Sequence, residues 1–197
     1  MSENILNVRI DAVDLKEAKE KVREFLDSNK QNKIFTPNPE MLVDAHKDKY
    51  FKEVLNDSDL NICDGKGIQL FSKGKLKRIP GIDFMLEICK IAEEEGKSVY
   101  LLGSGDKLVV ENTKAELLKK FPKLRISGIN QGPKITINNK QLLIDEEVNS
   151  KTIDEIIMTA PEILFVAFGH GKQEKWIDLN LEDLPSVKIA MGVGGAF

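Results

Sequence analysis

The feature that most constrains the fold is a repeated alternation of short apolar runs with longer amphipathic stretches. Runs such as "ILFVAFG" and "VKIAMGVG" are apolar throughout rather than at every second residue. This pattern is typical of parallel strands that are buried on both faces of a sheet. Parallel strands need crossover connections, and the amphipathic stretches between the runs can supply them as helices. The sequence therefore predicts an α/β fold with a parallel sheet covered on both faces.

Capping residues indicate where several helices begin and end. Asp14 and Glu17 form a capping-box pair at the start of one helix, and Asn38 is a favoured N-cap for another. Gly96 is expected to end a helix that starts near residue 81, in the left-handed conformation. The N-terminal "ILNVRI" alternates like a half-buried strand. Further helices are expected over residues 106–121, 145–160 and 172–184.

Composition excludes several classes of protein. The chain has 197 residues, of which 41% are hydrophobic and 31% charged, which suits one domain with a substantial core. A net charge of −3 argues against a general nucleic-acid binder. No apolar run approaches the ~18 residues of a membrane span, and the N-terminus lacks the pattern of a secretory signal. Cys63 and Cys89 are isolated from each other, which indicates reduced thiols in a cytosolic protein.

The chain stops at "GVGGAF", directly after a buried-type strand. Ligands of open α/β sheets bind at the carboxyl ends of strands, so a stop at this point would leave such a site half built. We therefore expect residues 1–197 to form a single domain from which a C-terminal segment has been removed.

Two polar segments follow predicted strands and could carry chemistry. In "FTPNPEML", Pro37 and Pro39 stiffen a corner that would aim Thr36, Asn38 and free helix amides above the sheet. In "CDGKG", Asp64 follows an apolar strand, where a carboxylate could act as a general base or bind a sugar hydroxyl. An ordinary strand–helix corner and an ordinary Asp-Gly turn explain the same residues equally well.

Two further loops could meet an anionic ligand. Gly103, Ser104 and Gly105 form a glycine loop, but Leu108 stands where a dinucleotide fingerprint needs its third glycine. A tight turn is at least as good an interpretation as a phosphate cradle. The basic stretch over residues 72–81 could meet a diphosphate or an anionic membrane surface, or simply be solvated. Within it, the guanidinium of Arg78 could grip a phosphate in two places.

Metal-site spacing is missing from the sequence. His170 could be a ligand or a base, but no His/Cys/Asp cluster accompanies it. The "DSD" at residues 57–59 mimics a metal-holding acid pair, yet it precedes its strand and so falls at the amino end of the sheet. We therefore predict no metal. Gln173 opens a helix, where its amide could bond an uncharged sugar or base.

The motifs, in their order along the chain, resemble the WecG/TagA/CpsF family of bacterial glycosyltransferases, and its TagA branch most. They are "TPNPEML", "CDGKG", "RIPGIDFM", "VYLLGS", "KFPKLRISGINQG", "ILFVAFGHGKQEKWI" and "KIAMGVGGAF". The resemblance implies a Rossmann-like fold and an inverting, metal-independent enzyme that needs no cofactor. It implies transfer of N-acetylmannosamine from UDP-N-acetylmannosamine to undecaprenyl-diphosphate-linked N-acetylglucosamine, the linkage unit of wall teichoic acid, at the inner face of the cell membrane.

The resemblance also implies roles for individual residues. Asp64 would be the general base for the acceptor 4-hydroxyl, and Thr36 and Asn38 would orient a sugar. Arg78 and Gln173 would help to hold the diphosphate and sugar. The glycine loop at 103–105 and Gly194 in the terminal "GVGG" would approach the nucleotide.

One departure from the family is large. Its members continue past "GGAF" into a tail that is associated with membrane attachment and with completion of the active site. Without such a tail, we expect weak donor binding, poor turnover and an exposed apolar patch that favours homo-oligomers. Two alternatives stay open: an NAD-dependent Rossmann-type oxidoreductase, which the failed glycine spacing disfavours, and a non-catalytic nucleotide-binding module.

Overall fold

The centre of the molecule is a six-stranded sheet in which all neighbouring strands run parallel. The computed structural model describes residues 1–103 and 105–197. The strand order is β4-β3-β10-β9-β5-β6. The strands are β3 (Asn32–Phe35), β4 (Leu60–Asn61), β5 (Ser98–Gly103), β6 (Arg125–Asn130), β9 (Ile163–Ala167) and β10 (Ile189–Gly192). The predicted parallel, Rossmann-like α/β fold is therefore confirmed.

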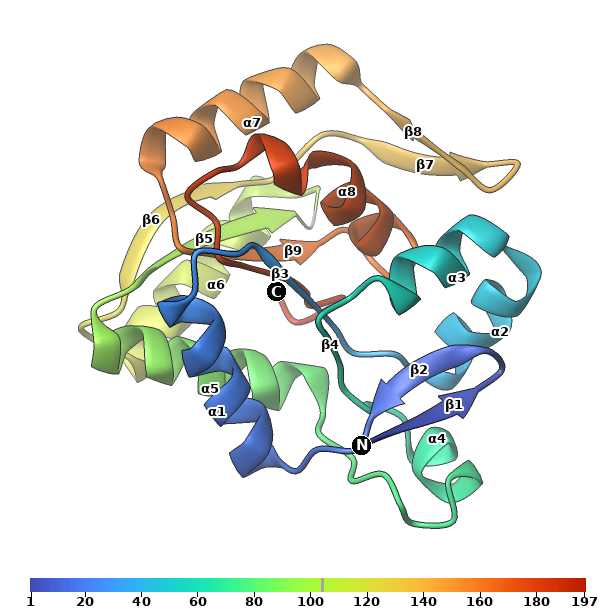
Figure 1. The fold of residues 1–197 in the computed structure, drawn as a ribbon. Helices are drawn as coiled ribbons and strands as arrows, with labels where there is room; N and C mark the ends of the chain where they lie inside the picture. Colours follow the sequence, from blue (N-terminus) through green and yellow to red (C-terminus); the bar gives the residue numbers. More distant parts are fainter. Residues whose placement is uncertain (104) are drawn as a thin grey trace.

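Helices cover both faces of this sheet (Figure 1). One face packs against α1 (Leu15–Asp27), α5 (Gly81–Glu95) and α6 (Lys107–Lys120). The other packs against α2 (Pro39–Lys47), α3 (Lys49–Asn56), α7 (Glu146–Thr159) and α8 (Lys172–Asn180). Leu164 and Phe165 are adjacent in β9 and fully buried, yet they belong to the two different core clusters. Burial on both faces explains why the strands are apolar at every position.

The predicted caps are present. The carboxylate of Asp14 accepts a hydrogen bond from the backbone N–H of Glu17, and the Glu17 carboxylate accepts one from the backbone N–H of Asp14. Gly96 ends α5 with a φ of 66°. These local bonds fix helix ends independently of the rest of the fold, which is why short sequence motifs could predict them.

The sequence prediction was wrong about two short antiparallel hairpins outside the main sheet. The stretch expected to be one strand turns at Leu6 and Asn7, both with positive φ, to form β1 (Ser2–Ile5) and β2 (Val8–Asp11). A second hairpin, β7 (Ile135–Asn138) and β8 (Gln141–Ile144), lies where no element was expected. Neither turn carries the Asn-Gly or Asp-Gly signal that marks hairpins in a sequence. A short α4 (Lys66–Phe71) and a 3-10 turn (Leu181–Asp183) complete the fold.

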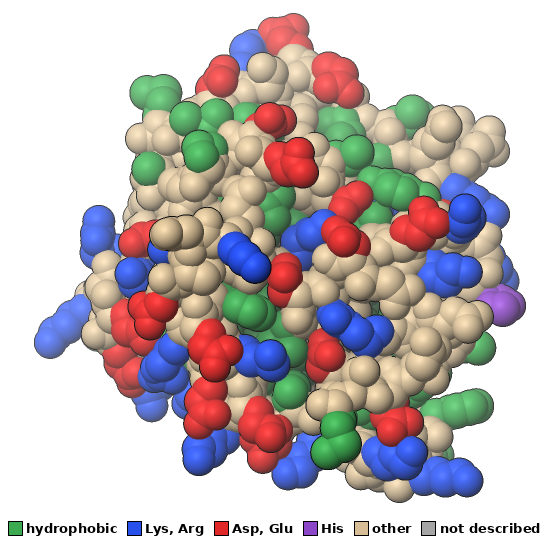
Figure 2. Space-filling view, in the orientation of Figure 1, with side chains coloured by type: hydrophobic (Ala, Val, Ile, Leu, Met, Phe, Trp, Pro, Cys, Tyr) green, Lys and Arg blue, Asp and Glu red, His purple; other side chains and the backbone are tan. Residues whose placement is uncertain are grey.

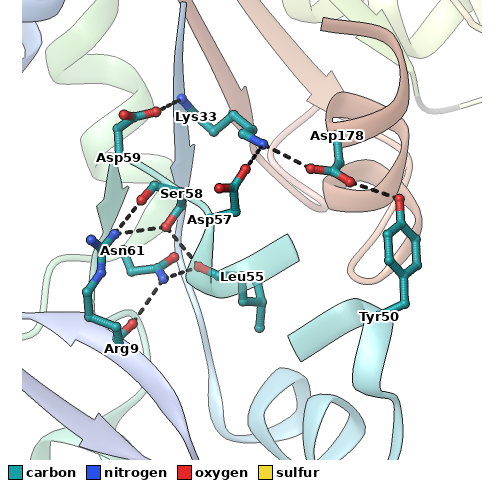
Figure 3. A network of polar contacts seen from close by, with 9 residues as sticks. All are labelled: Arg9, Lys33, Tyr50, Leu55, Asp57, Ser58, Asp59, Asn61 and Asp178. Carbon is teal, nitrogen blue, oxygen red and sulfur yellow. Dashed lines mark hydrogen bonds and ion pairs between the residues drawn. The ribbon is translucent and has the colours of Figure 1, made fainter. Parts of the chain in front are cut away.

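Charged side chains of both signs are interspersed over the face shown in Figure 2. At the amino end of the sheet they join into the network of Figure 3. Lys33 Nζ lies 2.9 Å from Asp178 and also binds Asp57. Desolvation opposes the charge on Lys33, but these two carboxylates outweigh it and raise the lysine pKa. Asp59 accepts a bond from the backbone N–H of Lys33. The "DSD" acids therefore lie at the amino end, as predicted, and bind a lysine.

Candidate active site

The opposite, carboxyl end of the sheet carries a cleft of about 380 Å³. It is formed by residues that follow β3, β4 and β10, together with the first turns of α5 and α8. Six of the residues predicted from the sequence line it: Thr36, Asn38, Asp64, Arg78, Gln173 and Gly194. Segments far apart in the sequence therefore meet here because parallel strands end at the same edge.

The proline-flanked corner is built as its sequence suggests. Asn38 Oδ1 accepts a hydrogen bond from the N–H of Met41 at 2.9 Å, and Pro39 is the first residue of α2. The carbonyl of Pro37 accepts a bond from the N–H of Asp64 at 3.2 Å. A Cβ on Gly65 would lie 2.5 Å from Pro39 Cδ, so only glycine lets the two motifs pack this closely. The Asn38 corner and the Asp64 turn thus form one unit.

Thr36 and Asp64 converge on the start of α5. A Cβ placed on Gly81 would lie 3.0 Å from Thr36 Oγ1 and 3.3 Å from Asp64 Oδ2. The hydroxyl and the carboxylate therefore face the same small space above Gly81. Sequence reasoning missed the role of Gly81; a glycine that opens a helix directly after a proline is the signal that could have indicated it.

Arg78 is tied to Asp64. Its Nε donates a hydrogen bond to the Asp64 carbonyl at 2.6 Å, and its Nη2 lies 3.6 Å from Asp64 Oδ1. The N–H of Ile79 also donates to the Cys63 carbonyl at 2.9 Å, so the two ends of the loop over residues 64–78 are clamped together. Both side chains remain about one-third exposed, which leaves a carboxylate and a guanidinium open to a ligand.

The side chain of Gln173 is buried, and its amide is bonded within the protein. Its Oε1 accepts a bond from the N–H of Gly194 at 2.9 Å, and its Nε2 donates to Glu174 Oε1 at 2.8 Å. Glu174 is almost fully buried, and this desolvation raises its pKa. The Gln173 side chain therefore supports the glycine turn that follows β10.

Gly103 and Gly105, the described glycines of the loop after β5, do not line this cleft. β9 separates β5 from β10, and the N–H of Gly105 donates to the carbonyl of Gln131. Gly103 has a φ of 128°, and a Cβ there would lie 2.7 Å from the Ala167 backbone, so close strand packing already explains this glycine. Ser104 lies outside the described residues. A nucleotide-binding role for this loop stays a prediction.

Comparison with known proteins places the chain among glycosyltransferases. Residues 3–197 match the model of the glycosyl transferase WecG/TagA/CpsF family. The chain belongs to this family. The predicted resemblance is thereby confirmed, and the NAD-dependent oxidoreductase is displaced as an alternative.

Curated relatives align with most of this sequence at 30% identity. An N-acetylglucosaminyldiphosphoundecaprenol N-acetyl-beta-D-mannosaminyltransferase of Staphylococcus aureus (strain NCTC 8325 / PS 47) is 30% identical over 200 residues, which cover 98% of this chain and 73% of that protein. A protein of the same name from Bacillus spizizenii is 30% identical over 177 residues, covering 88% of this chain and 63% of its own length.

His170 adds an imidazole to the cleft of this WecG/TagA/CpsF protein. Its Nε2 lies 3.1 Å from Asp44 Oδ2 on α2. Across the described residues, no three His, Cys, Asp or Glu side chains are grouped as metal ligands would be. None of the described helices has the length and apolar character needed to span a bilayer.

A larger groove of about 630 Å³ lies beside the cleft, between α5 and α6. Ile82 and Ala196 line both cavities. The groove is mostly apolar, and Glu116 is the one acid among the described residues that line it. The cleft instead combines a carboxylate, a guanidinium, a hydroxyl and amides. Because sugar transfer needs polar groups that converge, the smaller cavity is the candidate active site.

Proposed function

We propose that the chain transfers N-acetylmannosamine from UDP-N-acetylmannosamine to the 4-hydroxyl of a polyprenyl-diphosphate-linked N-acetylglucosamine. The observation that carries the proposal is the convergence of Asp64, Thr36, Asn38 and Arg78 in one cleft. The names of the Staphylococcus and Bacillus relatives supply the sugar and the lipid-linked acceptor. Each of these four residues can meet a need of that reaction.

Asp64 acts as the general base. It takes the proton of the acceptor hydroxyl, whose oxygen forms a bond to the anomeric carbon of the donor. The bond from that carbon to the UDP phosphate breaks, and the electron pair leaves with UDP. One displacement inverts the anomeric centre, so a single carboxylate is sufficient and no covalent sugar intermediate is needed.

The other residues bind and orient. Arg78 offers a cation beside Asp64, where it can hold a phosphate oxygen and fix the base. The Thr36 hydroxyl and the Asn38 amide face the cleft and can bond sugar hydroxyls. The reaction is proposed to need no metal, and the acid pair at residues 57–59 already binds Lys33 at the other end of the sheet.

The test is direct detection of the product. The protein is incubated with UDP-N-acetylmannosamine, a short-chain prenyl-diphosphate-N-acetylglucosamine and EDTA. Mass spectrometry is expected to find the disaccharide lipid with the unchanged protein. Asp64→Asn is expected to lower its rate at least about 100-fold. Equal rates would contradict the base role, and no product from the folded protein would contradict the proposed donor and acceptor.

A further inference from the structure

The loop that joins Asp64 to Arg78 carries two large apolar side chains on its outside. Leu70 and Phe71, the last two residues of α4, are 81% and 83% exposed. Single exposed apolar residues are common on protein surfaces, but two adjacent ones of this size at such exposure form a protrusion. Their exposure has a cost in water unless a partner covers them.

The rest of the loop is well anchored, so Leu70 and Phe71 project from an ordered segment. Ile68 and Leu76 are buried on either side of it. Ser72 Oγ donates to the Gln69 carbonyl at 2.7 Å and accepts from the N–H of Leu76 at 3.1 Å. The loop therefore folds back on its own core while presenting Leu70 and Phe71 to the outside.

The loop that carries the two apolar side chains is rich in lysine. Residues 65–77 contain no Asp or Glu, and the loop's four lysines, Lys66, Lys73, Lys75 and Lys77, are all exposed. Two of them form partial pairs with acids of other elements: Lys75 with Glu3 at 3.1 Å and Lys77 with Asp14 at 3.3 Å. In the lower right of Figure 2, around the position of α4 in Figure 1, hydrophobic and basic side chains lie close together, with an acidic side chain among them.

We propose that residues 65–77, hereafter the docking loop, bind the surface of an anionic bilayer. Leu70 and Phe71 enter the boundary between head groups and acyl chains, and the lysines contact anionic lipid head groups. An apolar tip on a lysine-rich loop suits a bilayer surface, because the chemistry of that surface changes from charged to apolar within a few ångströms.

The place of the loop in the fold supports a bilayer as the occupant. Both of its ends meet at the clamp between Asp64 and Arg78, so the loop is the direct neighbour of the candidate active site. This step rests on the proposed function, in which the acceptor sugar is attached to a membrane lipid. Docking through the loop would hold the cleft at the level where that sugar leaves the bilayer.

Vesicle binding by the 197-residue chain tests the proposal. Sedimentation with vesicles of phosphatidylcholine and phosphatidylglycerol is compared with sedimentation with phosphatidylcholine alone, and we expect binding to the anionic vesicles. Leu70→Ser/Phe71→Ser should weaken it about tenfold. The matched control, Met158→Ser/Leu179→Ser, removes exposed apolar residues from α7 and α8 and should leave it unchanged. No binding by the unchanged protein, or an equal loss in the control, would overturn the proposal.

Charge and insertion can be measured separately. Lys66→Gln/Lys73→Gln should lower binding to anionic vesicles by about fivefold for each lysine, whereas Lys119→Gln/Lys151→Gln should not. Because Trp176 is the one tryptophan and is fully buried, Phe71→Trp adds an exposed reporter. Its emission should shift to shorter wavelength on anionic vesicles; an unchanged spectrum would overturn insertion. No sugar substrate is present, so a chain that docks but transfers no sugar contradicts only the proposed function.

Discussion

The two ends of the central sheet use polar side chains in opposite ways. At the amino end, Lys33 binds two carboxylates and Asp59 accepts a backbone bond, so charges there are satisfied within the protein. At the carboxyl end, Asp64 and Arg78 touch each other at 3.6 Å and both remain open to the cleft. Both ends carry acids that flank the same strand, β4.

The difference teaches that the surroundings of a carboxylate, rather than its presence beside a strand, indicate its use. Asp59 precedes β4 and accepts a hydrogen bond from the backbone of β3, whereas Asp64 follows β4 and faces an open space above Gly81. Changes at the amino end should therefore act on stability, and changes at the carboxyl end on turnover.

After loss of the base itself, the largest effect is expected at Arg78. Arg78→Met removes the cation beside Asp64 and the bond to the Asp64 carbonyl, and it should lower turnover about 100-fold, equal to about 2.7 kcal/mol. Arg78→Lys keeps the charge without the planar fork and should recover part of the loss. Steady-state rates of UDP release measure both variants. Wild-type turnover in Arg78→Met would show that Arg78 takes no part in the reaction.

Lys33→Met tests the other end of the sheet. It leaves Asp178 partly buried without its cation, and we expect a loss of about 2 kcal/mol in the free energy of unfolding, measured by urea titration. Turnover per folded molecule should be unchanged. Lys151→Met, which breaks an exposed pair with Glu147 on α7, is the control and should cost little. A stable Lys33→Met protein with reduced turnover would contradict the proposed difference between the two ends of the sheet.

Variants of Asn38 can separate a role in stability from a role in turnover within one side chain. Asn38→Ala removes the cap of α2 and should cost about 1 kcal/mol of unfolding free energy. Asn38→Asp keeps a capping oxygen and replaces the amide donor with an anion, so stability should be retained while turnover falls. Thermal unfolding and UDP release distinguish the two. Full turnover in Asn38→Asp would mean that Asn38 serves the helix alone.

The smallest effect is expected at Glu162, again at the amino end. Desolvation opposes its charge, but bonds from the N–H and hydroxyl of Ser98 outweigh it and hold its pKa below the ordinary value of 4.5. A lowered pKa in the folded state gives stability that is present above pH 4.5 and is lost as pH falls through the folded value. Glu162→Gln should therefore be less stable by under about 1 kcal/mol at pH 7, and this difference should shrink in acid. Urea titrations at pH 7 and in acid measure this difference in unfolding free energy. A difference that does not change with pH would contradict the prediction.

Much of the fold and part of the site could be predicted because their causes are local. Apolar strands and capping residues such as Asn38 act within a few residues, and Asp64 could be placed at a strand end from its neighbours alone. Other features depend on distant partners. The burial of Gln173 depends on the turn at Gly194, and Gly103 is set apart from the cleft because β9 lies between β5 and β10. The spacing of residues along the chain does not indicate the order of the strands in the sheet.

The most direct test of the comparison is the turnover of two matched variants, Asp59→Asn and Asp64→Asn, each expressed per folded molecule. The same chemical change is made on either side of β4. The account predicts that Asp59→Asn transfers sugar at nearly the wild-type rate while Asp64→Asn loses at least about 100-fold. Similar rates in the two variants, whether both high or both low, would contradict it.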